Sequence, residues 1–446
     1  MFLKNKFFSP YMIILLSFVI VTILGGILLS LPISMNYGKS VKLIDGFFIA
    51  TSAICVTGLA SIDIGSVYNI FGQMVILILI QLGGLGVITF TSVIIILISK
   101  KIGYYTKKIV QEDININTTF KIEEYVKKVI FSVILIEVIG AVILFFEFIK
   151  KFSFLKAVYY SFFHSISSFC NAGFSLFSDN LSSFKNSLII NMTIPILIFL
   201  GGIGFSTILN CYNVLRKKEK YLTSTTKLSI KISILLVVIG MLAIFFLEYS
   251  NKNTIGSLSL GQKLEASFFQ SVTTRTAGFN TISMTGLKRS TSLLFIILMF
   301  IGASSGSTGG GIKTTTIGII FLGTLATLKN KDRIEYNKRS VSWRNYNKSI
   351  AILFISLIYT IICIFLLILL EKNKSLLDLA FEVFSAFGTV GLTRDLTPSL
   401  ADISKFIIIV TMFVGRVGPL TIALALSKLK LKKGHYIYPE ENILIG

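Results

Sequence analysis

The sequence predicts an all-α integral membrane protein made of four tandem units, each with a span, a short helix and a second span. Three observations carry this prediction. The chain is strongly apolar, one short motif occurs four times at a nearly constant period, and clusters of Lys and Arg separate the units. A fixed period marks repeated structural units.

The composition is that of a membrane protein rather than of a soluble domain. Of the 446 residues, 53% are hydrophobic and 14% are charged, and the mean hydropathy is +0.81. Several apolar runs reach about 20 residues, the length that a helix needs to cross a bilayer. The net charge of +22 comes mostly from Lys and Arg between these runs. No basic face with interleaved aromatic residues exists elsewhere, so the expected partner is the lipid bilayer and not nucleic acid.

The repeated motif is a short stretch with a glycine near its end. Each copy follows a short amphipathic run, and another glycine lies 24 to 28 residues later, deep in an apolar segment. The copies are residues 55–59, 170–174, 275–279 and 388–392. The run before each copy is too short to cross a bilayer, so it predicts a re-entrant helix.

The elements follow the same order in every unit. The units cover residues 1–100, 101–213, 214–328 and 329–427, with a tail at 428–446. The expected first spans are 11–31, 129–149, 232–249 and 350–370. The short helices are expected within 42–59, 154–168, 264–274 and 376–387. The second spans are expected at 73–98, 188–212, 293–328 and 403–426.

The basic linkers predict the orientation of these spans. They lie at 100–128, 216–231 and 329–348, and the tail carries a further cluster at 428–433. Cytoplasmic loops carry an excess of Lys and Arg. Eight spans with both termini in the cytoplasm, in the cell (plasma) membrane, satisfy this bias at every linker.

Four glycine-bearing loops at membrane depth indicate a pore. Non-helical backbone there must be shielded by protein or line a watery cavity. Loops that converge on one axis present rings of carbonyl oxygens, which can replace the hydration shell of a monovalent cation. We therefore expect four tandem span–pore helix–span (M1–P–M2) repeats around a pseudo-fourfold central pore. The alternative, that these glycines only pack helices, does not explain the repeated short helices.

Three stretches carry a family resemblance that covers essentially the whole chain. TSAICVTGL at 51–59, TTRTAGFN at 273–280 and SAFGTVGLT at 385–393 resemble the superfamily of K⁺ transporters that includes bacterial Trk and Ktr membrane subunits and plant HKT proteins. The similarity is greatest to the Ktr membrane subunit. It implies a K⁺ uptake pore, a homodimer, and a cytoplasmic ring of nucleotide-binding, RCK-type regulatory subunits. The resemblance does not decide whether Na⁺ only activates transport or is itself transported. No organic cofactor is expected.

The resemblance also places a K⁺ filter in the three residues that end at each repeated glycine. Backbone carbonyls would be the ligands of K⁺. Because only the glycine is common to all copies, selectivity is expected to be less strict than in potassium channels. In the family, glycine rather than serine in the first copy goes with K⁺ preference. The filter residues are Val56, Thr57, Gly58, Asn171, Ala172, Gly173, Thr276, Ala277, Gly278, Thr389, Val390 and Gly391.

A stretch rich in Gly and Ser is expected to interrupt the second span of the third unit only. Each Gly costs a helix about 1 kcal/mol relative to Ala, so this stretch must line a cavity. A nucleotide-binding P-loop would need Lys after its second Gly, where Ile312 stands. The resemblance instead implies an intramembrane gating loop, with Lys313 able to contact the regulatory ring. The loop residues are Gly302, Ala303, Ser304, Ser305, Gly306, Ser307, Thr308, Gly309, Gly310, Gly311 and Lys313.

Charged residues near the predicted pore complete the candidate site. Arg416 lies within the last apolar span, and an intramembrane arginine is costly unless it faces a cavity. We expect a barrier to ions beneath the filter. A compatible alternative is a hydrogen-bond donor to carbonyls that the broken helix leaves free. Three more residues beside the filter mouth either tune the local potential or form surface ion pairs: Arg275, Arg394 and Asp395.

Other function classes fit less well. The chain has two histidines, and no catalytic or zinc-binding pattern is recognisable. An enzyme is therefore not expected. A carrier that couples K⁺ to Na⁺ or H⁺ by alternating access is the alternative transport mechanism. Such carriers usually contain inverted repeats, whereas these units share one orientation because each makes two crossings.

Overall fold

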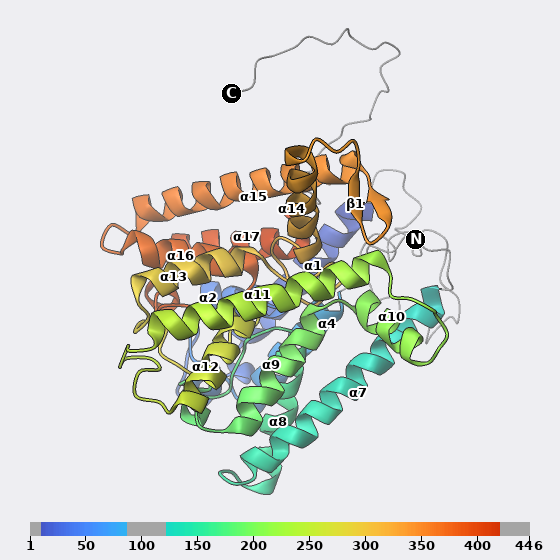
Figure 1. The fold of residues 1–446 in the computed structure, drawn as a ribbon. Helices are drawn as coiled ribbons and strands as arrows, with labels where there is room; N and C mark the ends of the chain where they lie inside the picture. Colours follow the sequence, from blue (N-terminus) through green and yellow to red (C-terminus); the bar gives the residue numbers. More distant parts are fainter. Residues whose placement is uncertain (1–9, 87–121, 420–446) are drawn as a thin grey trace, which may run out of the picture.

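The computed structural model describes residues 10–86 and 122–419, and these residues are mostly helical (Figure 1). The predicted tail at 428–446 and most of the first basic linker lie outside the described residues. A single small hairpin in the described part consists of β1 (Ile334–Tyr336) and β2 (Arg339–Val341), which pair antiparallel.

The helices occur in the predicted order. The long first helices are α1 (Pro10–Ser30), α7 (Ile122–Phe148), α11 (Ser224–Glu248) and α15 (Trp343–Leu370). The short helices are α2 (Leu43–Ile54), α8 (Phe154–Phe169), α12 (Leu260–Thr273) and α16 (Leu376–Gly388). The second-span segments are α4 (Ile70–Leu85), α9 (Leu188–Gly202) with α10 (Phe205–Leu215), α13 (Arg289–Phe300) with α14 (Thr314–Leu328), and α17 (Asp402–Val417). Minor helices are α3 (Ile64–Val67), η2 (Pro32–Ser34), η3 (Ser182–Phe184) and η4 (Thr397–Ser399).

The helices pack within units and around a ring. In every unit the first helix contacts the short helix; Figure 1 shows α15 running beside α16 and α17. Each second-span helix also contacts the short helix of the following unit, and the last unit closes on the first. These contacts join α4 to α8, α9 to α12, α13 to α16, and α17 to α2.

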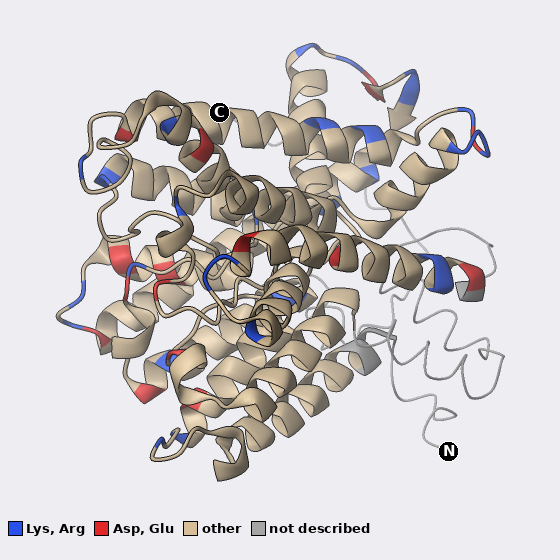
Figure 2. Ribbon diagram, turned by 90° about the horizontal axis from the view of Figure 1, so that it is seen from below, with Lys and Arg blue, Asp and Glu red and all other residues tan. Residues whose placement is uncertain are grey.

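The surface of the long helices suits a lipid environment. Within the described residues, α7, α11 and α15 are long and apolar enough to cross a membrane, and α9 with α10 would form a bent fourth span. Large apolar side chains on these helices are exposed, for example Phe131 at 70% and Phe246 at 73%. Lys, Arg, Asp and Glu gather at helix ends and loops, leaving the middle of the long helices largely uncharged (Figure 2). A soluble protein rarely exposes so much continuous apolar surface.

The expectation that only the third second span is interrupted is wrong. Helices α9 and α10 meet at 98°. The break lies at Gly204, whose φ is +99°, and α4 and α17 end at Gly86 and Gly418 with φ of +85° and +91°. A right-handed helix cannot continue through a left-handed residue. The signal was present in the sequence, because each of these glycines lies three residues after the repeated second-span glycine.

Three second-span glycines fix the distance between that helix and the short helix of the same unit. A Cβ on any of them would overlap the carbonyl oxygen at the end of the short helix. The pairs are Gly83 with Ile54, Gly201 with Phe169, and Gly415 with Phe387. The short helices are therefore held at one depth by direct backbone packing.

We predict that Gly201→Ala lowers the thermal unfolding temperature of the detergent-purified protein. The added methyl would be forced onto the Phe169 carbonyl, and overpacking of this kind costs about 1–3 kcal/mol. Gly261→Ala in α12 is the matched control, since a Cβ there meets no atom within 4 Å. Equal melting of Gly201→Ala and the wild type would contradict this packing.

Candidate functional site

Four loops with the same backbone conformation follow the four short helices. In each loop, the repeated glycine and the residue two places before it have positive φ. The glycines Gly58, Gly173, Gly278 and Gly391 have φ of +92°, +68°, +73° and +91°; the earlier residues Val56, Asn171, Thr276 and Thr389 have +56°, +62°, +67° and +49°. Positive φ is rare for β-branched residues. Such strain clusters at functional sites.

The four glycines form a closed ring in chain order. A Cβ on Gly58 would lie 2.5 Å from the carbonyl oxygen of Ala172. A Cβ on Gly173 would lie at the same distance from the carbonyl oxygen of Ala277, and one on Gly278 from that of Val390. Gly391 closes the ring against the carbonyl oxygen of Thr57. Only glycine allows this approach, and the approach gathers four carbonyl oxygens around one axis.

The helix ends hold these loops in place. The N–H groups of Thr57, Ala172 and Val390 donate to the carbonyls of Ser52, Ser167 and Ser385 at 2.8, 2.7 and 2.8 Å. Ser52 and Ser385 also accept through their hydroxyls from Gly58 and Gly391, at 3.0 and 3.1 Å. The loop N–H groups are thus used by the short helices, whose negative dipole ends meet at the ring. This arrangement favours a cation there.

One side of the ring opens into a cavity of about 440 Å³ that touches all four glycines. We call it the mouth cavity. Among the described residues that line it, Asp63, Asp179 and Asp395 are charged, and none is Lys or Arg. Asp63 also accepts from the backbone of Gly65 at 3.0 Å. Three carboxylates in a partly enclosed cavity attract cations to the ring.

Sequence reasoning found Asp395 but missed Asp63 and Asp179. The signal was the repeat itself, since these three residues follow their repeated glycines by four to six positions. Arg275 does not line the mouth cavity; it is buried, and its guanidinium donates to the carbonyl of Ser233 at 2.9 Å. Arg394 forms an ion pair with Asp378 at 2.6 Å.

The Gly/Ser-rich loop at 302–313 lies against the other side of the ring. The Gly310 N–H donates to the Thr389 hydroxyl at 2.8 Å, and a Cβ on Gly309 would overlap the hydroxyl oxygen of Thr276. Thr276 and Thr389 lie two residues before the ring glycines of the third and fourth units. The loop is therefore in direct contact with the predicted filter.

The same loop is hydrogen-bonded to the broken ends of other second spans. Ser304 and Thr308 donate to the carbonyls of Gly202 and Gly201 at 2.9 and 3.3 Å, and Gly311 donates to that of Gly415 at 3.2 Å. Lys313 donates to the Gly309 carbonyl at 2.7 Å, within the loop. The loop satisfies carbonyls that the ends of α9 and α17 leave free.

Arg416 bridges the loop to the first unit. Its guanidinium donates to the carbonyl oxygens of Thr308 in the loop and Gly83 in α4. Both acceptors are backbone carbonyls, one in the loop of the third unit and one near the end of α4 in the first unit. These hydrogen bonds also hold a positive charge beside the loop that faces the ring.

Known proteins share both the sequence and the fold. The chain matches the family model described as TrkH, a cation transport protein, over residues 5–434. It is 40% identical over 440 residues to Ktr system potassium uptake protein B of Bacillus subtilis, covering 98% of this chain and 97% of that protein. It is 36% identical over 446 residues to the potassium/sodium uptake protein NtpJ of Enterococcus hirae, covering 99% and 98%.

The fold resembles a solved transporter. The crystal structure of the potassium transporter TrkH from Vibrio parahaemolyticus superposes with a TM-score of 0.75 at 20% identity, covering 95% of this chain and 86% of that one. Sequence and fold agree over nearly the whole length. The chain belongs to the TrkH family of cation transport proteins.

Proposed function

We propose that this chain is the pore-forming subunit of a K⁺ uptake system in the cell membrane. The observation that carries the proposal is the closed ring of Gly58, Gly173, Gly278 and Gly391, each against its neighbour's carbonyl. A ring of carbonyls can replace the hydration shell of K⁺. The similar proteins from Bacillus subtilis and Enterococcus hirae are named for potassium and potassium/sodium uptake.

K⁺ would enter from the mouth cavity and pass through the ring. We assign the filter to the three residues that end at each ring glycine, with backbone carbonyls as ligands. Thr57 adds a buried hydroxyl that has no hydrogen-bond partner among the described residues. The mouth cavity then faces outside, and both termini lie in the cytoplasm, as the basic linkers predict.

The Gly/Ser-rich loop at 302–313 would be the gate. Its contacts with Thr389 and Thr276 support a position beneath the filter, and Arg416 connects it to α4 through hydrogen bonds to Thr308 and Gly83. Opening would break the Arg416 hydrogen bonds and swing the loop aside. A cytoplasmic ring of nucleotide-binding subunits would drive that step on a homodimer of this chain, in keeping with the relative's description as part of a Ktr system.

The alternative is a carrier that couples K⁺ to Na⁺ or H⁺. It predicts that K⁺ uptake stops without a gradient of the second ion. The pore predicts uptake driven by membrane potential alone, with Na⁺ at most an activator. Uptake into vesicles with an imposed potential and no Na⁺ or H⁺ gradient separates the two mechanisms.

We expect Gly58→Ser to lower the ratio of K⁺ to Na⁺ uptake about tenfold, or about 1.4 kcal/mol in relative barrier. The new Cβ would approach the Ala172 carbonyl to 2.5 Å at a φ of +92°, so the ring must widen or distort. Uptake of each ion in transport-deficient cells measures the ratio. Gly261→Ser is the control. An unchanged ratio would mean that the glycines only pack the loops.

Arg416→Gln should raise K⁺ uptake in the absence of the regulatory partner several-fold, because the guanidinium no longer links Thr308 of the loop to Gly83 of α4. Arg416→Lys keeps the positive charge but cannot donate to both carbonyls in the same geometry. If Arg416 acts as a charge barrier, the Lys variant should behave like the wild type. If Arg416 acts by holding the loop through its two hydrogen bonds, the Lys variant should behave like Arg416→Gln. Arg289→Gln, at an exposed helix start, is the control. Unchanged partner-independent uptake in both Arg416 variants would refute a role in gating.

Neutralising the mouth cavity should weaken K⁺ capture at low concentration. We expect Asp63→Asn, Asp179→Asn and Asp395→Asn together to raise the KM for K⁺ about threefold at low ionic strength with little change in maximal rate. Salt should erase the difference, because it screens exposed charges. Glu335→Gln, on the hairpin β1–β2, is the control. A KM that does not respond to either substitution or salt would exclude electrostatic attraction by these residues.

A further inference from the structure

Four buried polar side chains occupy the same position in the four second-span helices. Each is the fourth residue after the helix N-cap. They are Gln73, Asn191, Ser292 and Lys405, and all four are buried. Burying a polar group is costly unless it forms a hydrogen bond or ion pair. We therefore expect the four side chains to have partners at equivalent places in the fold.

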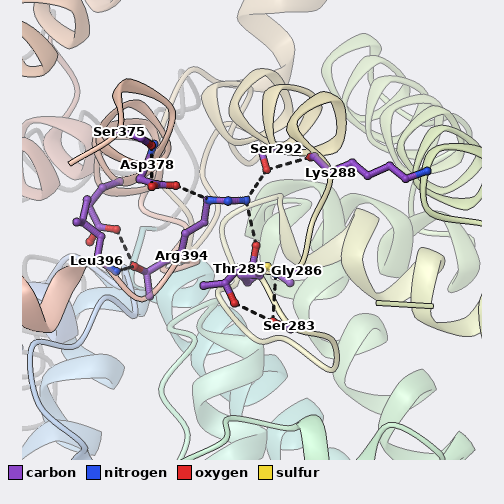
Figure 3. A network of polar contacts seen from close by, with 12 residues as sticks. Ser283, Thr285, Gly286, Lys288, Ser292, Ser375, Asp378, Arg394 and Leu396 are labelled. Atoms are coloured by element: carbon purple, nitrogen blue, oxygen red, sulfur yellow. Dashed lines mark hydrogen bonds and ion pairs between the residues drawn. The ribbon is translucent and has the colours of Figure 1, made fainter. Parts of the chain in front are cut away.

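Each side chain reaches the short-helix region of the following unit. Tyr159 on α8 donates to Gln73 at 2.8 Å, and Asn191 lies 3.5 Å from Glu265 on α12. The hydroxyl of Ser292 accepts from Arg394 at 2.7 Å, and Arg394 is paired with Asp378 on α16 (Figure 3). Lys405 is paired with Asp45 on α2 at 2.7 Å. The contact therefore occurs at all four boundaries between units.

The partners also share a register relative to the ring. Asp45, Glu265 and Asp378 each lie 13 residues before the ring glycine of their unit, and Tyr159 lies 14 before its own. The second-span partners each lie ten residues before the second-span glycine of their unit (Gly83, Gly201, Gly302 or Gly415), near the opposite end of those helices. The four contacts thus form a belt around the short helices, one helix length from the ring.

The contact between Lys405 and Asp45 differs from the other three. It joins the last unit to the first, across 360 residues of sequence. Its side chains are only 7% and 8% exposed, so the charges have little access to solvent. Asp45 is in the first turn of α2, where the helix dipole favours a carboxylate. Removing either partner would leave an uncompensated buried charge.

We propose that these four contacts are positioning devices that set the spacing of the short helices and so the width of the carbonyl ring, with Lys405–Asp45 as the pair that closes it. This proposal rests on the proposed function. Three boundaries are held together by the continuous chain. The fourth has no covalent link and depends on noncovalent contacts, and α2 leads directly into the loop that carries Gly58. Loosening this boundary should widen the ring and reduce discrimination between K⁺ and Na⁺.

The test compares ion uptake by variants of this pair, corrected for the amount of protein in the membrane. Asp45→Asn and Lys405→Gln should each lower the ratio of K⁺ to Na⁺ uptake at least threefold. The reversed pair Asp45→Lys with Lys405→Asp should recover part of it. The control is Lys42→Gln with Asp402→Asn, because those residues pair at the same boundary at 3.9 Å but are 73% and 59% exposed. The control should keep the wild-type ratio.

If the single variants do not reach the membrane, a double variant with two uncharged side chains can still test the proposal. Asp45→Asn with Lys405→Met leaves no uncompensated charge, and such replacements of buried pairs are often tolerated. A neutral pair at wild-type abundance with the wild-type ion ratio would overturn the proposal and leave the proposed function standing. A wild type that carries neither ion would instead overturn both.

Discussion

The close approach of four glycine-bearing loops is the constraint on which the rest of this structure depends. Each ring glycine lies against a carbonyl of the next unit, so every unit must deliver its loop to the same depth and angle. The short helices deliver the loops, and two sets of contacts hold each short helix in position. Second-span glycines pack against their C-terminal carbonyls, and the belt of polar contacts joins them to the preceding unit.

The ends of the second-span helices create a second requirement. Carbonyls at the ends of α4, α9 and α17 lose their helical partners, and inside a membrane protein such groups must be satisfied by protein or water. The Gly/Ser-rich loop and Arg416 supply donors to Gly83, Gly201, Gly202 and Gly415. The hydrogen bonds that satisfy these carbonyls are therefore the same ones that hold the loop against the ring, where the proposed gate lies.

Much of the architecture could be predicted because the repeat is visible along the chain. The short helices lie where expected to within a few residues, and the family match confirms a cation transporter rather than an enzyme. The break at Gly204 and the helix ends at Gly86 and Gly418 were missed because a single glycine in an apolar run is compatible with a helix. Asp63 and Asp179 were missed because their spacing from the ring glycines varies.

By itself, the sequence determined the membrane class, the four units and the glycines that a crowded ring needs, since these follow from composition, period and the missing Cβ. Only the tertiary structure decided which groups meet. Lys405 and Asp45 are 360 residues apart, and neither shows a partner in its own neighbourhood of the chain. Arg416 likewise finds Thr308 and Gly83 only once the units have closed. Contacts across a ring depend on the order and angle of packing, which local periodicity does not encode.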